Sequence, residues 1–218
     1  MADFASQREA MVARQIAARG VTGAAVLAAM REVPREAFVS AALADRAYDD
    51  MPLPIEAGQT ISQPYIVALM IEAAGVAPGD RVLEIGAGSG YAAAVIGRIA
   101  AAVIAIERHA ELAALAAGRM RRLGYRNVTI VEGDGSAGWP EGAPYDAILA
   151  AASGSHVPDL LRRQLRPGGG ILVMPVGEPG GVQSLVKVTR LGEGDYQDEH
   201  LGAVRFVPLI GAQGWDER

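Results

Sequence analysis

The sequence contains no cysteine and a single lysine, Lys187. Without cysteine, the protein can form no disulfide bond, no zinc–thiolate site and no thiol nucleophile. Arginine supplies nearly all of the positive charge, yet the formal net charge of the 218-residue chain is −5. Because proteins that bind nucleic acids carry basic clusters, this charge balance gives no sign of a nucleic-acid partner.

Long hydrophobic runs and a targeting signal are also missing. No apolar stretch approaches the roughly 20 residues that cross a bilayer. The first nine residues, Met1–Glu9, lack the basic and then apolar pattern of a secretory signal. The hydrophobic fraction of 50% and the charged fraction of 21% are ordinary for a globular protein. We therefore expect a soluble cytoplasmic protein with no membrane partner and no metal site, and a monomer by default.

From residue 81 onward, short apolar segments alternate with segments of helical periodicity. The alternation predicts a doubly wound, Rossmann-like α/β fold, with a mostly parallel seven-stranded sheet that closes with an antiparallel C-terminal pair. The predicted strands are 82–85, 103–106, 128–131, 145–150, 171–176, 183–189 and 203–207, and the predicted helices are 91–100, 110–123 and 157–165.

The first 76 residues are predicted to form a helical extension. Ser6 and Glu9 have the spacing of a capping box for a helix that ends at Gly20, and Thr22 is placed to cap a second helix. Residues 48–61 indicate an ordered loop, and a helix is expected over 64–74. We expect one domain over 1–218, with this extension at 1–76 and the α/β core at 77–218.

The segment after the first core strand has the character of a cofactor loop. Gly86, Gly88 and Gly90 follow an apolar strand and precede a helix, so backbone can approach a ligand closely there. Tyr91 stands where the dinucleotide fingerprint needs its third glycine, so the pattern favours a small adenosyl ligand over a dinucleotide. Glu84 lies inside the apolar strand, where a carboxylate is costly unless it is paired. The cationic groups of S-adenosylmethionine could supply that pairing.

Two further acidic positions follow the next two strands. Glu107 comes 21 residues after Gly86, a spacing suited to accepting ribose hydroxyls, although it could equally be an exposed acid at a strand end. Asp134, with Gly135 after it, could accept the exocyclic amine of adenine, although Asp-Gly is also a common turn pair.

The polar segment 58–64 precedes a helix that Pro64 is placed to start. Ser62 could cap that helix or act on a substrate. The three histidines, His109, His156 and His200, are scattered and more typical of surface or packing positions. A serine hydrolase is weakly supported, because the sequence has no G-x-S-x-G motif.

Taken together, these segments resemble the protein-L-isoaspartate (D-aspartate) O-methyltransferase family of class I methyltransferases over nearly the whole chain. The matching residues are 33–39, 47–50, 52–55, 58–64, 82–91, 133–135, 144–148, 164–165, 175–177 and 206–209. The glycine loop is shared by many methyltransferases, whereas the Thr-Ile-Ser segment is particular to this family. The sequence departs from the family pattern at Ala87, Ala92, 151–154 and Ile210.

The resemblance implies a repair reaction and a set of site residues. A methyl group would pass from S-adenosylmethionine to the free α-carboxylate of an L-isoaspartyl residue, and the resulting ester would cyclise to a succinimide away from the enzyme. Ser62 would be the active-site residue. The implied cofactor contacts are Thr60, Ile61, Glu84, Gly86, Gly88, Ser89, Gly90, Glu107, Asp134 and Gly135.

Other readings remain open from the residues alone. A methyltransferase acting on a small-molecule carboxylate has the same glycine loop. A nicotinamide oxidoreductase is disfavoured by the glycine spacing. A non-catalytic module that binds S-adenosylmethionine would need a disrupted acceptor segment, yet 60–62 is intact.

Overall fold

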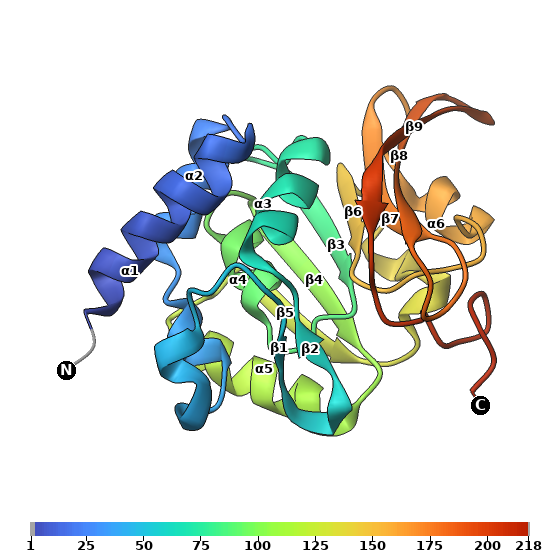
Figure 1. The fold of residues 1–218 in the computed structure, drawn as a ribbon. Coiled ribbons are helices and arrows are strands. Elements are labelled where there is room, and N and C mark those ends of the chain that lie inside the picture. The colour runs from blue at the N-terminus through green and yellow to red at the C-terminus, as the bar shows by residue number, and fades with distance from the viewer. Residues whose placement is uncertain (1–2, 218) are drawn as a thin grey trace.

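A seven-stranded sheet forms the centre of the molecule, with strand order β5-β4-β3-β6-β7-β8-β9 (Figure 1). The computed structural model describes residues 3–217, so Met1, Ala2 and Arg218 of the expected 1–218 unit lie outside it. The strands from β5 to β7 run parallel, while β8 and β9 are antiparallel, which confirms the predicted architecture. The strand bounds are β3 (Arg81–Ile85), β4 (Ala102–Glu107), β5 (Val128–Glu132), β6 (Ala147–Ala150), β7 (Gly170–Val176), β8 (Gln183–Gly192) and β9 (Asp195–Val204).

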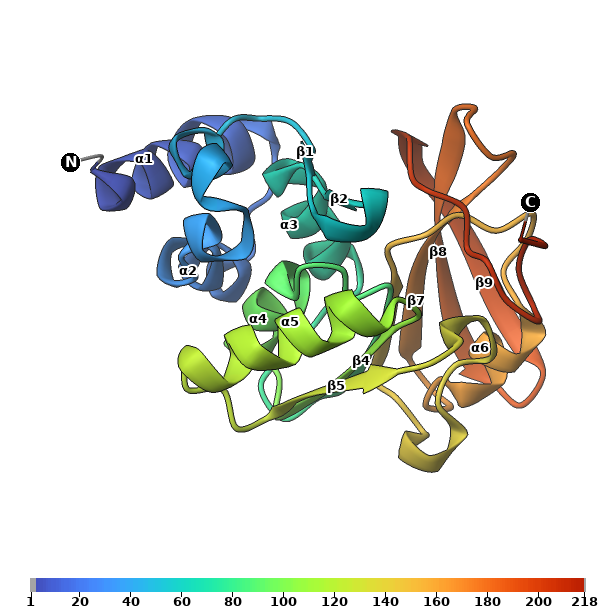
Figure 2. The ribbon, with the colours of Figure 1, turned by 90° about the horizontal axis from the view of Figure 1, so that it is seen from below.

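Helices cover both faces of this sheet. In Figure 2, α4 (Tyr91–Gly97) and α5 (Ala110–Arg122) lie on one side of β4 and β5, and α6 (Asp159–Gln164) lies near the other half of the sheet. Successive strand residues face opposite sides, so Val82 packs into one apolar cluster and Leu83 into the other. Burial on both faces explains why the core strands are continuously apolar.

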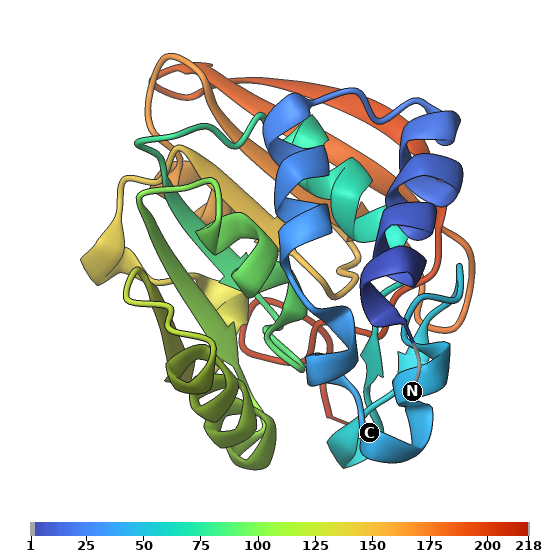
Figure 3. The ribbon, with the colours of Figure 1, turned by 90° about the vertical axis from the view of Figure 1, so that its left-hand side faces the viewer.

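The predicted N-terminal helical extension packs against the α4 side of the sheet. It contains α1 (Phe4–Met11), which continues through a π-helical segment (Val12–Ile16) and a 3-10 segment (Ala17–Arg19), and α2 (Ala24–Glu32). These helices lie beside α3 (Pro64–Ala73) (Figure 3). Their buried residues join the cluster that contains Val82. The extension is therefore part of the core packing.

Both helix caps expected near the N-terminus are wrong. Asp3, not Ser6, caps α1, because its Oδ1 accepts a hydrogen bond of 3.1 Å from the Ser6 amide. The amides of Thr22 and Gly23 donate to the carboxylate of Glu72, which belongs to α3. A residue distant in sequence thus binds the two backbone amides that lead into α2.

The expected loop over 48–61 contains a small hairpin. β1 (Leu53–Pro54) pairs antiparallel with β2 (Thr60–Ile61), and a 3-10 turn (Glu56–Gly58) joins them. α3 begins directly afterwards with Pro64 in its first turn, as predicted. We refer to residues 53–62 as the hairpin segment.

The second strand of the C-terminal pair was misplaced by the sequence pattern, which indicated 203–207. β9 runs from Asp195 to Val204 and forms the edge of the sheet. Most of its residues are exposed and polar, so the hydrophobic alternation that marks an internal strand is missing. No helix within residues 3–217 is long and apolar enough to cross a membrane.

Candidate active site

A cavity of about 980 Å³ lies between the carboxyl ends of the central strands and the hairpin segment. Ligands of open α/β sheets bind at this edge, beside the point where the strand order reverses. Here the reversal falls between β3, which leads on to β4, and its other neighbour β6. The sequence-predicted residues that line the cavity are Thr60, Ile61, Ser62, Glu84, Gly86, Gly88, Ser89, Glu107 and Gly135.

The glycine loop takes a conformation that other residues rarely adopt. Gly86, Gly88 and Gly90 have φ angles of 84°, 53° and 88°, in the region that favours glycine. The amides of Gly86 and Ala87 both donate to the carbonyl of Ile106 in β4, at 2.9 and 3.0 Å. The loop is therefore fixed to the neighbouring strand while it lines the cavity.

Glu84 is a buried acidic residue. Its side chain lies in β3 with 2% of the residue exposed, and its Oε2 has no hydrogen-bond partner within residues 3–217. Burial, with a smaller contribution from the charge of Glu107, raises its pKa well above the usual value of 4.5. A cationic group bound in the cavity would offset this cost.

Glu107, at the end of β4, is held by backbone amides. Its Oε2 accepts from Gly88 at 2.8 Å, and its Oε1 accepts from His109 at 2.9 Å. The residue is 5% exposed and lines the cavity. Each carboxylate oxygen can accept more than one hydrogen bond, so the side chain retains capacity for a pair of ligand hydroxyls.

Two of the sequence-predicted cofactor residues do not line this cavity. Gly90 caps α4 and lies against α5, where an added Cβ would come within 3.2 Å of Ala116 and Met120. The carboxylate of Asp134 accepts from the amides of Ser136 and Ala212, each at 2.8 Å. Asp134 instead lines a smaller neighbouring hollow, beside the C-terminal segment 211–217.

The pKa of Asp134 reflects this environment. Burial raises the pKa of Asp134, but the hydrogen bonds from Ala212 and Ser136 together lower it by more. The net effect is a pKa below the usual value of 3.8. The C-terminal segment is held at two more points, because Gln213 donates to Ser136 Oγ at 3.0 Å and Arg108 pairs with Glu217. Asp134 is therefore an ionised anchor for this segment.

Ser62 is half-buried and lines the cavity at the end of the hairpin segment. It does not cap α3, because Gln63 occupies the cap position. The segment lies over the glycine loop, where a Cβ on Gly88 would be 3.5 Å from Ile55. Arg119 links the two, since it donates to the Ser89 carbonyl at 3.2 Å and lies 3.6 Å from the Glu56 carboxylate. The geometry thus brings the serine segment and the glycine loop to one cavity.

Comparison with known proteins identifies the family. The family model described as protein-L-isoaspartate(D-aspartate) O-methyltransferase matches residues 6–214. A protein-L-isoaspartate O-methyltransferase of Rhodopseudomonas palustris is 59% identical over 207 residues, which cover 95% of this chain and 94% of the relative. One from Pelobacter propionicus is 57% identical over 209 residues, with 96% and 92% covered. The chain belongs to this family.

Solved structures of the family share the fold. A protein-L-isoaspartate O-methyltransferase structure, 30% identical, matches with a TM-score of 0.85 over 94% of this chain and 66% of that longer chain. A Plasmodium falciparum beta-aspartate methyltransferase in complex with S-adenosyl-L-homocysteine is 25% identical, with a TM-score of 0.79 and 93% and 98% covered. Family, enzyme class and S-adenosylmethionine dependence, as predicted from the motifs, are confirmed.

Several residues that line the cavity were not predicted from the sequence. His109 lines the cavity, although its position indicated surface or packing. The opposite wall comes from the glycine-rich turn 180–182 and from Arg205 and Phe206. A glycine-rich turn before a β-hairpin was the available signal, but nothing in the sequence pairs it with β3. The cavity is also lined by Ala87, Ala92 and Ile210, three positions at which the sequence departs from the family pattern.

Proposed function

We propose that this protein transfers the methyl group of S-adenosylmethionine to the free α-carboxylate of L-isoaspartyl residues in damaged proteins, with Ser62 at the reacting carboxylate. The observation that carries the proposal is the continuity of one cavity from the glycine loop to Ser62. The cofactor and the acceptor can therefore meet within it. Membership of the methyltransferase family supports the same reaction.

The residues at the β3 end of the cavity fit the cofactor. The unpartnered Oε2 of Glu84 is suited to the amino group of the methionine moiety. Glu107 would accept the ribose hydroxyls, and the backbone at Gly86, Gly88, Ser89 and Gly135 would surround the adenosyl group. When bound, S-adenosylmethionine supplies a methyl group on a positively charged sulfur.

We further propose direct contacts from the hairpin segment and from Asp134. Thr60 and Ile61 would close over the cofactor, which fits their position in the cavity wall. Asp134 would accept a hydrogen bond from the adenine amine with a lone pair that the backbone amides leave free. Gly90 would support the cofactor site indirectly, through the packing of α4 on α5.

The acceptor needs no general base. A carboxylate is already ionised at pH 7, so no proton has to leave before it reacts. One bond forms between a carboxylate oxygen and the methyl carbon while the bond from that carbon to sulfur breaks, which leaves a methyl ester and S-adenosylhomocysteine. The protein has to position two reactants, an effect that can supply about 7–11 kcal/mol. In this scheme the Ser62 hydroxyl donates a hydrogen bond to the carboxylate and orients it.

We propose that residues 1–218 act as one domain, in which the extension over 1–76 presents Ser62 and the core over 77–218 holds the cofactor. We propose a monomeric enzyme, in which the glycine loop and Ser62 of the same chain line one cavity. With a net charge of −5, we propose that the partners are isoaspartyl proteins and not nucleic acids. The cytoplasm is the proposed location.

The test is methyl transfer from radiolabelled S-adenosylmethionine to a synthetic isoaspartyl peptide, with the matching aspartyl peptide as control. Base-labile label on the isoaspartyl peptide alone is expected. Label on neither peptide, despite measurable cofactor binding, would contradict the proposal. A panel of small carboxylic acids should then be assayed, because a metabolite methyltransferase is the remaining candidate with the same cofactor.

A further inference from the structure

Arg35 is a fully buried arginine without an acidic partner. It lies in the 3-10 turn Arg35–Phe38 of the N-terminal extension with 0% of its surface exposed. No carboxylate within residues 3–217 lies within ion-pair distance of it. A buried charge of this kind is costly, and well-packed apolar residues often serve stability equally well or better. Its presence calls for a role other than packing.

The guanidinium joins three parts of the chain. Its Nε donates to the Ala47 carbonyl at 2.7 Å, and its Nη2 donates to the Ser62 carbonyl at 2.8 Å. The Cζ atom of Arg35 lies 4.7 Å from the centre of the Tyr91 ring. Tyr91 is the first residue of α4, directly after the glycine loop.

These contacts fix the backbone that carries Ser62. Arg35 does not line the cavity, whereas Ser62 and Tyr91 both do. The next residue, Gln63, is held as well, because its Nε2 donates to the carbonyl and to Oδ1 of Asp50 at 3.1 and 2.8 Å. Through Arg35, the Ser62 backbone is therefore connected to Ala47 within the extension and to Tyr91 at the start of α4.

We propose that Arg35 is the positioning residue for Ser62: its guanidinium sets the Ser62 backbone relative to the glycine loop, so that the serine hydroxyl meets the acceptor carboxylate. The planar guanidinium of arginine holds the two carbonyls in a fixed relative geometry, whereas the compact ammonium of lysine has no such rigid fork. This inference rests on the proposed role of Ser62.

The test compares Arg35→Met and Arg35→Lys with the wild-type chain of 218 residues. Arg35→Met keeps an unbranched side chain but removes both hydrogen bonds. Turnover of the isoaspartyl peptide should fall at least tenfold, while the Kd for S-adenosylmethionine stays within about threefold. Arg35→Lys should restore part of the turnover through one hydrogen bond.

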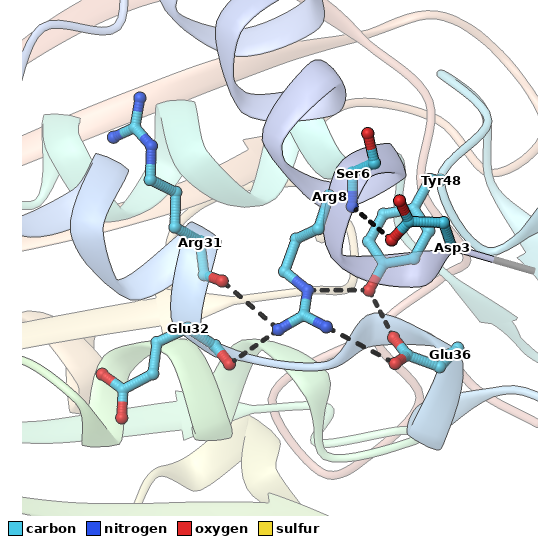
Figure 4. A network of polar contacts seen from close by, with 7 residues as sticks. All are labelled: Asp3, Ser6, Arg8, Arg31, Glu32, Glu36 and Tyr48. Atoms are coloured by element: carbon cyan, nitrogen blue, oxygen red, sulfur yellow. Dashed lines mark hydrogen bonds and ion pairs between the residues drawn. The ribbon is translucent and has the colours of Figure 1, made fainter.

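Arg8 offers a matched control in the same extension. Its guanidinium donates to Tyr48 and to the carbonyls of Arg31 and Glu32, and it pairs with Glu36 (Figure 4). Among residues 3–217, its hydrogen bonds and ion pair reach neither Ser62 nor Gln63. Arg8→Met should lower the melting temperature and leave turnover at 25 °C within about twofold. An equal loss of turnover in Arg8→Met would mean that general loosening of the extension explains the effect, and would overturn the proposal.

A double-mutant cycle separates positioning from a merely structural role. If Arg35 acts through Ser62, Arg35→Met should have almost no further effect on turnover in a Ser62→Ala background. A full tenfold loss in that background would contradict the proposal. Should Arg35→Met fail to fold, Arg35→Lys enters the same cycle, and unaltered turnover in that variant would count against the proposal. If the wild-type protein does not methylate the isoaspartyl peptide, the proposed function fails before this comparison begins.

Discussion

The Gly88 amide donates a 2.8 Å hydrogen bond to Oε2 of Glu107, so the acid that ends β4 fixes the loop that follows β3. One side chain thus holds the glycine loop and retains acceptor capacity toward the cavity. Under the proposed function, this contact links cofactor affinity to the geometry of the loop.

Replacing Glu107 with alanine should weaken the binding of S-adenosylmethionine. The loss of charge-assisted hydrogen bonds, each worth about 1.5–3 kcal/mol, should raise the Kd roughly 10- to 150-fold per bond. Isothermal titration calorimetry measures the Kd for S-adenosylmethionine. Glu111→Ala is the control, because Glu111 is exposed and lines neither the cavity nor the neighbouring hollow. Equal affinities of the two variants would refute this role for Glu107.

Glu84→Gln should stabilise the ligand-free protein at neutral pH and weaken cofactor binding. Because the pKa of Glu84 is raised in the folded state, folded protein retains a proton that unfolded protein has lost above about pH 4.5. Stability associated with Glu84 is thus full below that pH and falls as pH rises toward the raised pKa. Thermal melts between pH 5 and 8 should show that the melting temperature falls less with rising pH in the variant than in the wild type. Exposed Glu141→Gln is the control, with an unchanged pH profile expected.

Cofactor binding should release a proton for the same reason. Pairing with a cation returns Glu84 to its ionised form, so affinity should rise with pH between the ordinary and the raised pKa. Calorimetry in buffers of different ionisation enthalpy measures the release. Proton release of the same size in Glu84→Gln would point to another group.

Ser62→Ala should reduce turnover and spare cofactor affinity. Loss of a hydrogen bond to a charged carboxylate costs about 1.5–3 kcal/mol, roughly 10- to 150-fold in kcat. Steady-state methyl transfer to an isoaspartyl peptide gives the rate, and calorimetry gives the Kd for S-adenosylmethionine. The control is Ser155→Ala, at an exposed serine outside the cavity lining. Full activity in the Ser62 variant would remove the serine from the mechanism.

Asp134→Ala tests whether this acid serves the cofactor as well as the C-terminal segment. The matched variant Ser136→Ala removes the acceptor for Gln213 and leaves the carboxylate. Both variants should shift the fluorescence of Trp215 in a Trp139→Phe background, because both loosen segment 211–217. Only Asp134→Ala should also weaken S-adenosylmethionine binding, by roughly tenfold. Equal affinities of the two variants would limit Asp134 to its anchoring role.

The sequence predicted what depends on local pattern and missed what depends on distant contacts. The apolar strands around Val82 and Leu83 and the glycine loop have strong periodic or positional signals, and they form as expected. The cap supplied by Glu72 comes from another helix, and β9 is a polar edge strand, so neither leaves a signal in its own segment.

In the candidate site, too, residues set by local pattern could be predicted and those set by distant contacts could not. Residues of the glycine loop could be located because their backbone geometry restricts residue type. The contact of Asp134 with Ala212 joins positions 78 residues apart. The guanidinium of Arg35 connects Ala47 with Ser62 through two hydrogen bonds. Such relationships appear only once the chain is folded, since neither partner alters the local pattern of the other.

The hairpin segment and the glycine loop come from different parts of the chain, one from the N-terminal extension and one from the sheet. Thr60 and Ile61 lie beside Ser62 in the lining of the cavity, so under the proposed function one short stretch of the hairpin segment faces both the cofactor and the acceptor. A substitution in this stretch is therefore expected to alter cofactor affinity and acceptor preference together.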